Sequence, residues 1–134
     1  MSSVGRTPGV RVLVVDDEES VLTFAERTLH DAGYDVVVAT TGEEAVRIAA
    51  AQQPFAVAVV DLVLPLMRGD EVARQLRRVN PDIKVLYFTG YADRLFQEKR
   101  TLWEDEAFLE KPVTIAAFRE AVSLLLYGRT KGAT

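Results

Sequence analysis

Apolar residues along the chain follow two alternating patterns. Short runs rich in β-branched and aliphatic residues occur at 11–16 (RVLVVD), 34–40 (YDVVVAT), 55–62 (FAVAVVDL), 84–89 (KVLYFT) and 106–112 (EAFLEKP). Runs of this kind are typical of buried strands. Between them, apolar residues recur at helical spacing in the stretches 18–33, 41–53, 69–79 and 114–128. The alternation predicts an α/β fold, with five strands in one parallel sheet and helices on both faces.

Local signals support these boundaries. Gly33 and Gly128 stand where helix C-terminal caps belong, and Thr41 with Glu44 forms the sequence pattern of a capping box. The stretch 91–105 should hold one more helix, although its end lacks a clear glycine stop. We expect one domain over 10–128, with disordered tails at 1–9 and 129–134.

Composition narrows the classes of function. The chain has 134 residues, of which 49% are hydrophobic, a formal net charge of −4 and no cysteine. Disulfides and thiolate chemistry are therefore excluded, and a cytoplasmic protein is expected. We find neither a signal peptide nor a run of about 18 apolar residues, so no membrane insertion is expected. The negative charge argues against direct binding of nucleic acid.

Polar residues gather where the predicted strands end. They are Asp16 and Asp17 after the first strand, Asp61 after the third, Thr89 after the fourth, and Glu110 and Lys111 after the fifth. Ligands of open parallel sheets bind at the carboxyl ends of the strands, so these side chains should meet at one edge. Carboxylates crowded together raise one another's pKa unless a cation holds them ionised, and Mg²⁺ suits such oxygen ligands. The pattern predicts a magnesium site.

Each residue alone has a simpler interpretation. An acid after a strand is often a helix N-cap, and Lys111 before Pro112 could be an ordinary surface lysine. His30 near a helix end is interpreted as structural, and Arg77 with Arg78 as a solvated helix face. Only the conjunction of strand ends that carry the residue types of one chemistry favours a site.

Four motifs, in this order and spacing, carry a family resemblance: VVDDEE, VVDLVLPLMRGDE, YFTGYA and FLEKP. Over about residues 10–127 the chain resembles a response-regulator receiver domain of two-component signalling. The segment LWEDEA before the fifth strand is more similar to receivers of hybrid sensor histidine kinases. The resemblance implies a flavodoxin-like, doubly wound sheet.

The resemblance also implies roles for single residues. Asp61 would be the phospho-acceptor, and Asp16, Asp17, Asp61 and the backbone carbonyl of Val63 would be Mg²⁺ ligands. Lys111 would pair with the phosphoryl group, Thr89 would be the switch hydroxyl, and Phe108 the switch aromatic residue. The peptide bond before Pro112 would be cis. Val63 and Tyr91 would flank the approach of water and set the lifetime of the phosphate.

The implied function is a phospho-accepting switch. A sensor histidine kinase or a phosphotransfer protein would donate the phosphoryl group, and the domain would catalyse only its own phosphorylation and slow dephosphorylation. A homodimer through the face of the last helices is a further expectation. Leu95, Phe96, Leu102 and Trp103 either pack on the sheet, which we favour, or form a docking patch.

Two alternatives from other classes are weaker. A phosphatase with an aspartyl-phosphate intermediate needs a general acid two residues after its nucleophile, where this chain has Val63. A pseudo-receiver that binds partners without phosphorylation usually lacks the acceptor, an acid or the lysine, and none of these is missing. The sequence leaves open whether the chain is a stand-alone receiver or part of a hybrid kinase.

Overall fold

The computed structural model describes residues 10–52, 54–90 and 106–128. In these ranges the strands are β1 (Arg11–Val15), β2 (Asp35–Ala39), β3 (Val57–Val60), β4 (Lys84–Thr89) and β5 (Glu106–Glu110). The helices are α1 (Glu19–Asp31), α2 (Gly42–Ala51), α3 (Gly69–Val79) and α5 (Ile115–Tyr127). The predicted boundaries of β4 and α3 match these elements, whereas β5 ends two residues before the predicted end at Pro112.

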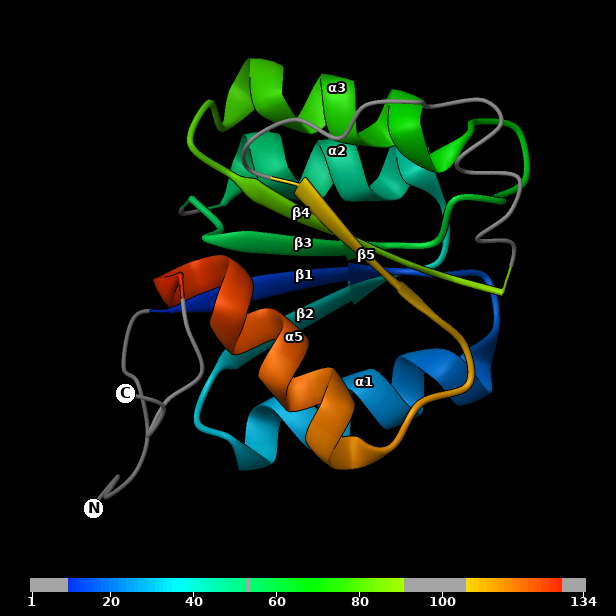
Figure 1. The fold of residues 1–134 in the computed structure, drawn as a ribbon. Helices are drawn as coiled ribbons and strands as arrows, with labels where there is room; N and C mark the ends of the chain where they lie inside the picture. The colour runs from blue at the N-terminus through cyan, green and yellow to red at the C-terminus, as the bar shows by residue number, and fades with distance from the viewer. Residues whose placement is uncertain (1–9, 53, 91–105, 129–134) are drawn as a thin grey trace.

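The strands form one parallel sheet in the order β2-β1-β3-β4-β5. Helices α2 and α3 cover one face of the sheet, and α1 and α5 cover the other (Figure 1). The predicted fold class, a doubly wound parallel sheet with helices on both faces, is confirmed. The predicted helix within 91–105, its four apolar residues and both terminal tails lie outside the described residues.

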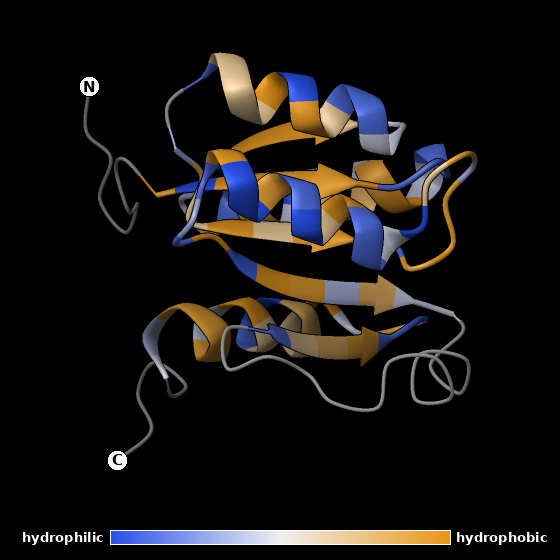
Figure 2. Ribbon diagram, turned by 90° about the horizontal axis from the view of Figure 1, so that it is seen from above, coloured by the Kyte–Doolittle hydropathy of each residue, from blue (hydrophilic) through white to orange (hydrophobic). Residues whose placement is uncertain are grey.

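The core has two layers because successive strand side chains point to opposite faces. Ala58 and Val60 of β3 pack toward α2 and α3, whereas Val57 and Val59 pack toward α1 and α5. All four residues are buried, as the unbroken apolar run predicts. Figure 2 shows the strands hydrophobic along most of their length and the helices banded with hydrophilic segments.

The helix ends follow the local signals in the sequence. Thr41 accepts a hydrogen bond from the backbone N–H of Glu44 at 3.1 Å, as the capping box predicts. Gly33 and Gly128 have φ values of 101° and 78°, in the left-handed region that glycine adopts at low cost. Among the described helices, we find none long and apolar enough to cross a membrane.

Candidate functional site

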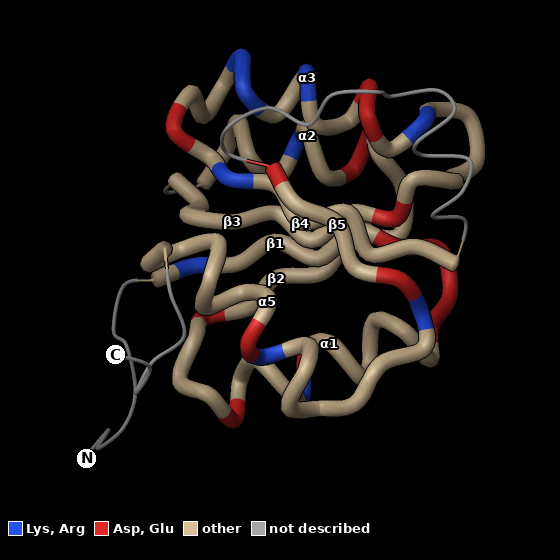
Figure 3. Tube along the Cα trace, in the orientation of Figure 1, with Lys and Arg blue, Asp and Glu red and all other residues tan. Residues whose placement is uncertain are grey.

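The carboxyl ends of β1 and β3 bring two aspartates together. Val15 pairs with Val60 in the sheet, so Asp16 and Asp61 follow directly from neighbouring positions. The hydrogen bonding between β1 and β3 continues to Asp61, whose backbone N–H donates to the carbonyl of Val15 at 3.0 Å. Both aspartates are buried, at 1% and 5% exposure. Acidic segments gather at this edge of the sheet (Figure 3), where sequence analysis placed the site.

Lys111 reaches this edge from the end of β5. Its ammonium lies 2.8 Å from an Asp16 oxygen, 3.3 Å from Glu18 and 3.5 Å from Asp61. The Lys111 side chain is only 14% exposed. Its backbone N–H donates to the carbonyl of Thr89 at 2.9 Å, which ties the end of β4 to the end of β5. Three carboxylates and one ammonium therefore share a single cluster.

Burial has opposite consequences for the acids and the lysine. It raises the pKa of Asp61, and Lys111, a hydrogen bond from Thr89 and the N–H of Val63 only partly offset this. Burial likewise raises the pKa of Asp16 despite its hydrogen bond to Lys111. For Lys111, burial opposes the charged form, but the hydrogen bond to Asp16 and the charges of Asp61 and Asp16 outweigh it and raise the pKa. Burial thus disfavours the ionised form of both acids, and for Asp16 the neighbouring Asp61 adds to this.

Glu18 joins the cluster, and this was not expected from the sequence. Oxygens of Asp16, Glu18 and Asp61 lie within 4.8 Å of one another, the spacing of a group that can hold a metal ion. Asp17, the expected ligand, is exposed and is not part of that group. The role of Asp17 therefore stays a prediction. The signal for Glu18 was its place in the acidic run VVDDEE, but the sequence could not show which of these acids lies beside Lys111 and Asp61.

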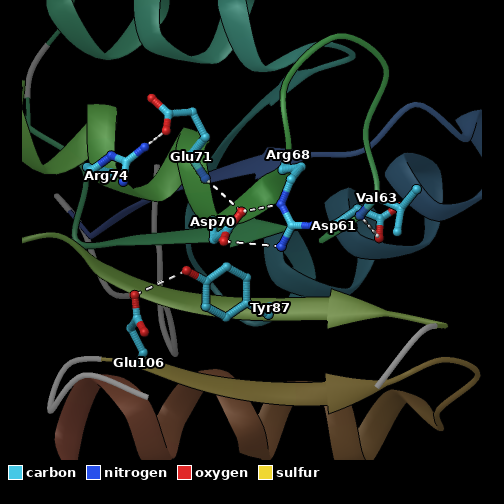
Figure 4. Close-up of polar contacts among 8 residues, drawn as sticks. All are labelled: Asp61, Val63, Arg68, Asp70, Glu71, Arg74, Tyr87 and Glu106. Carbon is cyan, nitrogen blue, oxygen red and sulfur yellow. Dashed lines mark hydrogen bonds and ion pairs between the residues drawn. The ribbon is translucent and has the colours of Figure 1, made fainter. Parts of the chain in front are cut away.

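The loop after β3 shapes the surroundings of Asp61. The N–H of Val63 donates to an Asp61 carboxylate oxygen at 3.3 Å (Figure 4). Gly69 passes so close that a Cβ there would lie 2.2 Å from the Asp61 carbonyl oxygen. Its own N–H donates to the carbonyl of Leu62 at 2.8 Å. Only glycine can close the loop this tightly, so Gly69 helps to hold the carboxylate at the end of β3.

Arg68 and Asp70 close the same loop from the start of α3. The Arg68 guanidinium meets both Asp70 carboxylate oxygens, at 3.0 and 3.2 Å (Figure 4). Such a two-pronged pair fixes both side chains better than a single contact would. Arg68 is thus engaged in the loop that leads from Asp61 to α3.

The two expected switch residues lie on the neighbouring strands β4 and β5. Thr89 is fully buried at the end of β4, with 0% exposure. Phe108 on β5 is half-buried and packs against the core layer under α2 and α3. The Lys111–Pro112 peptide bond is cis, as the resemblance implied. Tyr91 lies outside the described residues, and Val63 is 39% exposed.

One buried polar network contradicts the sequence interpretation. Arg77 is not on a solvated face: its side chain is 18% exposed and forms an ion pair with Glu106, whose side chain is 0% exposed. The hydroxyl of Tyr87 donates to the same Glu106 carboxylate at 3.1 Å (Figure 4). Arg78 is exposed, as predicted. The two adjacent arginines differ because the helix turns one toward β5 and the other toward solvent. His30, at 60% exposure, lies outside the cluster.

Comparisons with known proteins agree with this arrangement. The chain is 42% identical over 80 residues to the alkaline phosphatase synthesis transcriptional regulatory protein PhoP of Bacillus subtilis (strain 168). It is 34% identical over 116 residues to the sensor kinase CckA of Brucella abortus (strain 2308). These matches cover 60% and 86% of this chain but only 33% and 12% of the two relatives. The chain thus spans a third or less of either relative.

Solved structures show the same fold. A response regulator receiver protein from Sinorhizobium medicae WSM419 superposes with a TM-score of 0.78 at 32% identity, covering 89% of this chain and 95% of that one. The response regulator TrrA of Thermotoga maritima, in complex with Mg²⁺ and BeF, has a TM-score of 0.76 at 27% identity, with coverages of 87% and 99%.

The sequence model described as "Response regulator receiver domain" matches residues 12–123. This match includes Asp16, Asp61, Thr89 and Lys111, the residues that the fold brings to one edge. The chain therefore belongs to the response-regulator receiver domains, a family of signalling domains that typically accept a phosphoryl group.

Proposed function

We propose that Asp61 accepts a phosphoryl group from the phosphohistidine of a sensor histidine kinase or a phosphotransfer protein. The observation that carries this proposal is the position of Lys111, whose ammonium lies 3.5 Å from the Asp61 carboxylate and 2.8 Å from Asp16. A buried carboxylate beside a buried ammonium suits attack on an anionic group, because the lysine offsets charge that builds up during transfer.

The proposed reaction is an in-line displacement. A carboxylate oxygen of Asp61 attacks phosphorus, the new O–P bond forms, and the P–N bond to the histidine breaks. The histidine nitrogen keeps that electron pair, so the kinase histidine is restored and an acyl phosphate remains on Asp61. The Val63 N–H, which donates to Asp61 at 3.3 Å, orients the nucleophile. Lys111 stabilises the phosphoryl oxygens.

The donor set fits a magnesium ion. Oxygens of Asp16 and Asp61 are buried close together, and hard oxygen ligands of this kind suit Mg²⁺. When bound, the ion would supply positive charge that offsets the negative charge on the phosphoryl oxygens. We propose Asp16, Asp17, Asp61 and the Val63 carbonyl as ligands. Burial raises the pKa of both Asp16 and Asp61 despite Lys111, and a bound cation would favour their ionised forms, which supports this proposal.

The proposed signal passes through Thr89 and Phe108. Thr89 would turn its hydroxyl to the phosphoryl group, and Phe108 would shift in the space that Thr89 leaves. Both start from packed positions, Thr89 fully buried and Phe108 half-buried against the core. Phosphorylation would thus bias an equilibrium between two packings of the β4–β5 edge. In this scheme the domain catalyses only its own phosphorylation and slow self-dephosphorylation.

Location and assembly complete the proposal. A cytoplasmic site of action is proposed because the kinase phosphohistidine is made from cytoplasmic ATP. A homodimer through α5 is proposed because Leu124 and Tyr127 on that helix are 42% and 54% exposed. Sedimentation at several protein concentrations tests the dimer, and a constant monomer mass would exclude it.

Labelling with a small phosphodonor tests the function. Wild-type protein with Mg²⁺ and phosphoramidate should gain one phosphate, detected by intact mass, and should gain none with a metal chelator. Asp61→Asn keeps the shape but cannot form the acyl phosphate, so it should stay unlabelled. A wild type that gains no phosphate, with its fold intact, would favour the pseudo-receiver alternative. Equal labelling of Asp61→Asn would reject Asp61 as the acceptor.

A further inference from the structure

We infer that Glu18 is a positioning residue for Lys111, which holds the ammonium in the resting site and competes with the phosphoryl group for it. The inference rests on the proposed function, because it concerns how the same site pairs its lysine. Glu18 belongs to neither the buried aspartate pair nor the expected ligands. It therefore adds a control on the phosphorylated state that the acceptor and the metal ligands do not supply.

The place of Glu18 in helix α1 is the first observation. Glu18 is the N-cap residue of α1, yet its side chain makes no capping hydrogen bond. At the same position of α2 and α5, the side chains of Thr41 and Thr114 accept backbone N–H bonds at 3.1 and 3.0 Å. Serine, threonine, asparagine or aspartate is the usual choice at an N-cap. The Glu18 carboxylate makes no capping hydrogen bond, so its oxygens are available for another partner.

That partner lies far away in the sequence. The Glu18 carboxylate lies 3.3 Å from the Lys111 ammonium, across 93 residues of chain. Meanwhile the backbone N–H of Glu18 donates to Asp16 at 2.9 Å and so orients the carboxylate that also holds Lys111. The Glu18 side chain is 61% exposed, whereas those of Asp16 and Asp61 are 2% and 6% exposed. Glu18 is thus the solvent-facing member of the three acids around the ammonium.

Competition follows from the donor count of an ammonium. Lys111 has three N–H donors, and three carboxylates surround it in the resting site. The Asp61 contact, at 3.5 Å, is the longest, and it is the one that changes when Asp61 carries the phosphoryl group. Of the other two carboxylates, Glu18 makes the longer contact and faces water, so Glu18 is the one that Lys111 releases as it turns to the phosphoryl oxygens. An exposed ion pair typically changes an equilibrium constant by at most about fivefold, so losing the Glu18 contact should change the affinity for the phosphoryl mimic by no more than this.

Binding of beryllofluoride, a phosphoryl mimic, measures this competition at saturating Mg²⁺. Fluorine NMR of the bound mimic gives the half-saturating concentration. We expect Glu18→Gln to lower it by about threefold, within the range for exposed pairs. Glu19→Gln removes the same charge from an exposed neighbour in the first turn of α1 and should leave it nearly unchanged. Equal affinities of Glu18→Gln and wild type would overturn the inference.

A cycle with Lys111→Met separates positioning from simple charge repulsion. If Glu18 acts through Lys111, Glu18→Gln should have no effect in the Lys111→Met background. An undiminished effect there would mean direct repulsion of the anion and would overturn the inference. A metal-free readout is the rate at which an amine-reactive reagent acylates Lys111, followed by peptide mass. This rate should rise in Glu18→Gln, and an unchanged rate would also contradict the inference.

The same experiments distinguish this inference from the proposed function. If wild-type protein binds beryllofluoride and Asp61→Asn does not, the proposed function stands, whatever the effect of Glu18→Gln. If Asp61→Asn binds the mimic as well as wild type, the proposed function fails before Glu18 is considered.

Discussion

Replacing Arg77 with methionine should destabilise the fold markedly, although Arg77 lies on the outer helix α3. Its guanidinium pairs with Glu106, whose side chain is completely buried at the start of β5. Methionine keeps much of the length and apolar stem but cannot pair with the carboxylate. The change therefore leaves a buried negative charge with the Tyr87 hydroxyl and without its guanidinium.

The magnitude follows from the cost of removing one partner of a buried ion pair. Removing one partner of a buried ion pair typically costs about 3–5 kcal/mol. The Tyr87 hydroxyl still donates to Glu106 at 3.1 Å, and Arg77 itself is 18% exposed, so we expect the lower end, about 3 kcal/mol. For a domain of this size, that loss lowers the melting temperature by roughly 10 °C.

Urea and thermal unfolding, followed by circular dichroism, measure the change against matched variants. Arg78→Met, an exposed neighbour on the same helix, should stay within about 0.5 kcal/mol of wild type. Tyr87→Phe removes one hydrogen bond to a charged group and should cost about 1.5–3 kcal/mol. The double variant Arg77→Met with Glu106→Met removes both charges and should recover most of the loss.

Two outcomes would refute this reasoning. An Arg77→Met variant as stable as Arg78→Met would show that the ion pair does not compensate the burial of Glu106. A double variant whose loss equals the sum of the two single losses would show that the residues act independently, since paired residues should give a large coupling energy.

Further predictions concern the site itself. Burial raises the pKa of the Asp61 carboxyl, so the metal-free protein should lose stability as the pH rises from about 3.8 through the pKa of Asp61 in the folded state. Asp61→Asn should remove that loss and be more stable than wild type at pH 7 without Mg²⁺. Unfolding measured in the presence of a chelator tests this. Asp17→Ala should weaken Mg²⁺ binding markedly in a calorimetric titration, and an unchanged affinity would exclude Asp17 as a ligand. Gly69→Ala should reduce labelling of Asp61 and stability together, because its Cβ would lie 2.2 Å from the Asp61 carbonyl oxygen, and normal labelling would argue against this tight loop. The double variant Val63→Asn with Tyr91→Glu should speed dephosphorylation about tenfold or more, equivalent to about 1.4 kcal/mol in the barrier, because the introduced amide and carboxylate can orient the attacking water. The decay of phosphorylated protein after donor removal measures this rate, and an unchanged rate would show that these two positions do not set the lifetime.

The sequence by itself determined the elements and the place of the site. Continuous apolar runs such as Val57–Val60 require burial on both faces, and this forces helices onto both sides of the sheet. Because the strands are parallel, their carboxyl ends share one edge. The residues that follow them, Asp16, Asp61 and Lys111, could therefore be placed together from the sequence alone.

Only the tertiary structure decided which polar side chains meet. The sequence pattern could not choose between Asp17 and Glu18, because adjacent residues in a loop differ only in the direction in which the backbone turns them. Nor could it show that Arg77 pairs with Glu106 while Arg78 is exposed, since helical spacing places a side chain on its own helix but does not say which residue of another element lies opposite. Glu18 pairs with Lys111 across 93 residues, and Arg77 pairs with Glu106 across 29. Such pairs depend on how the elements pack in three dimensions, and helical and strand periodicity do not encode that packing.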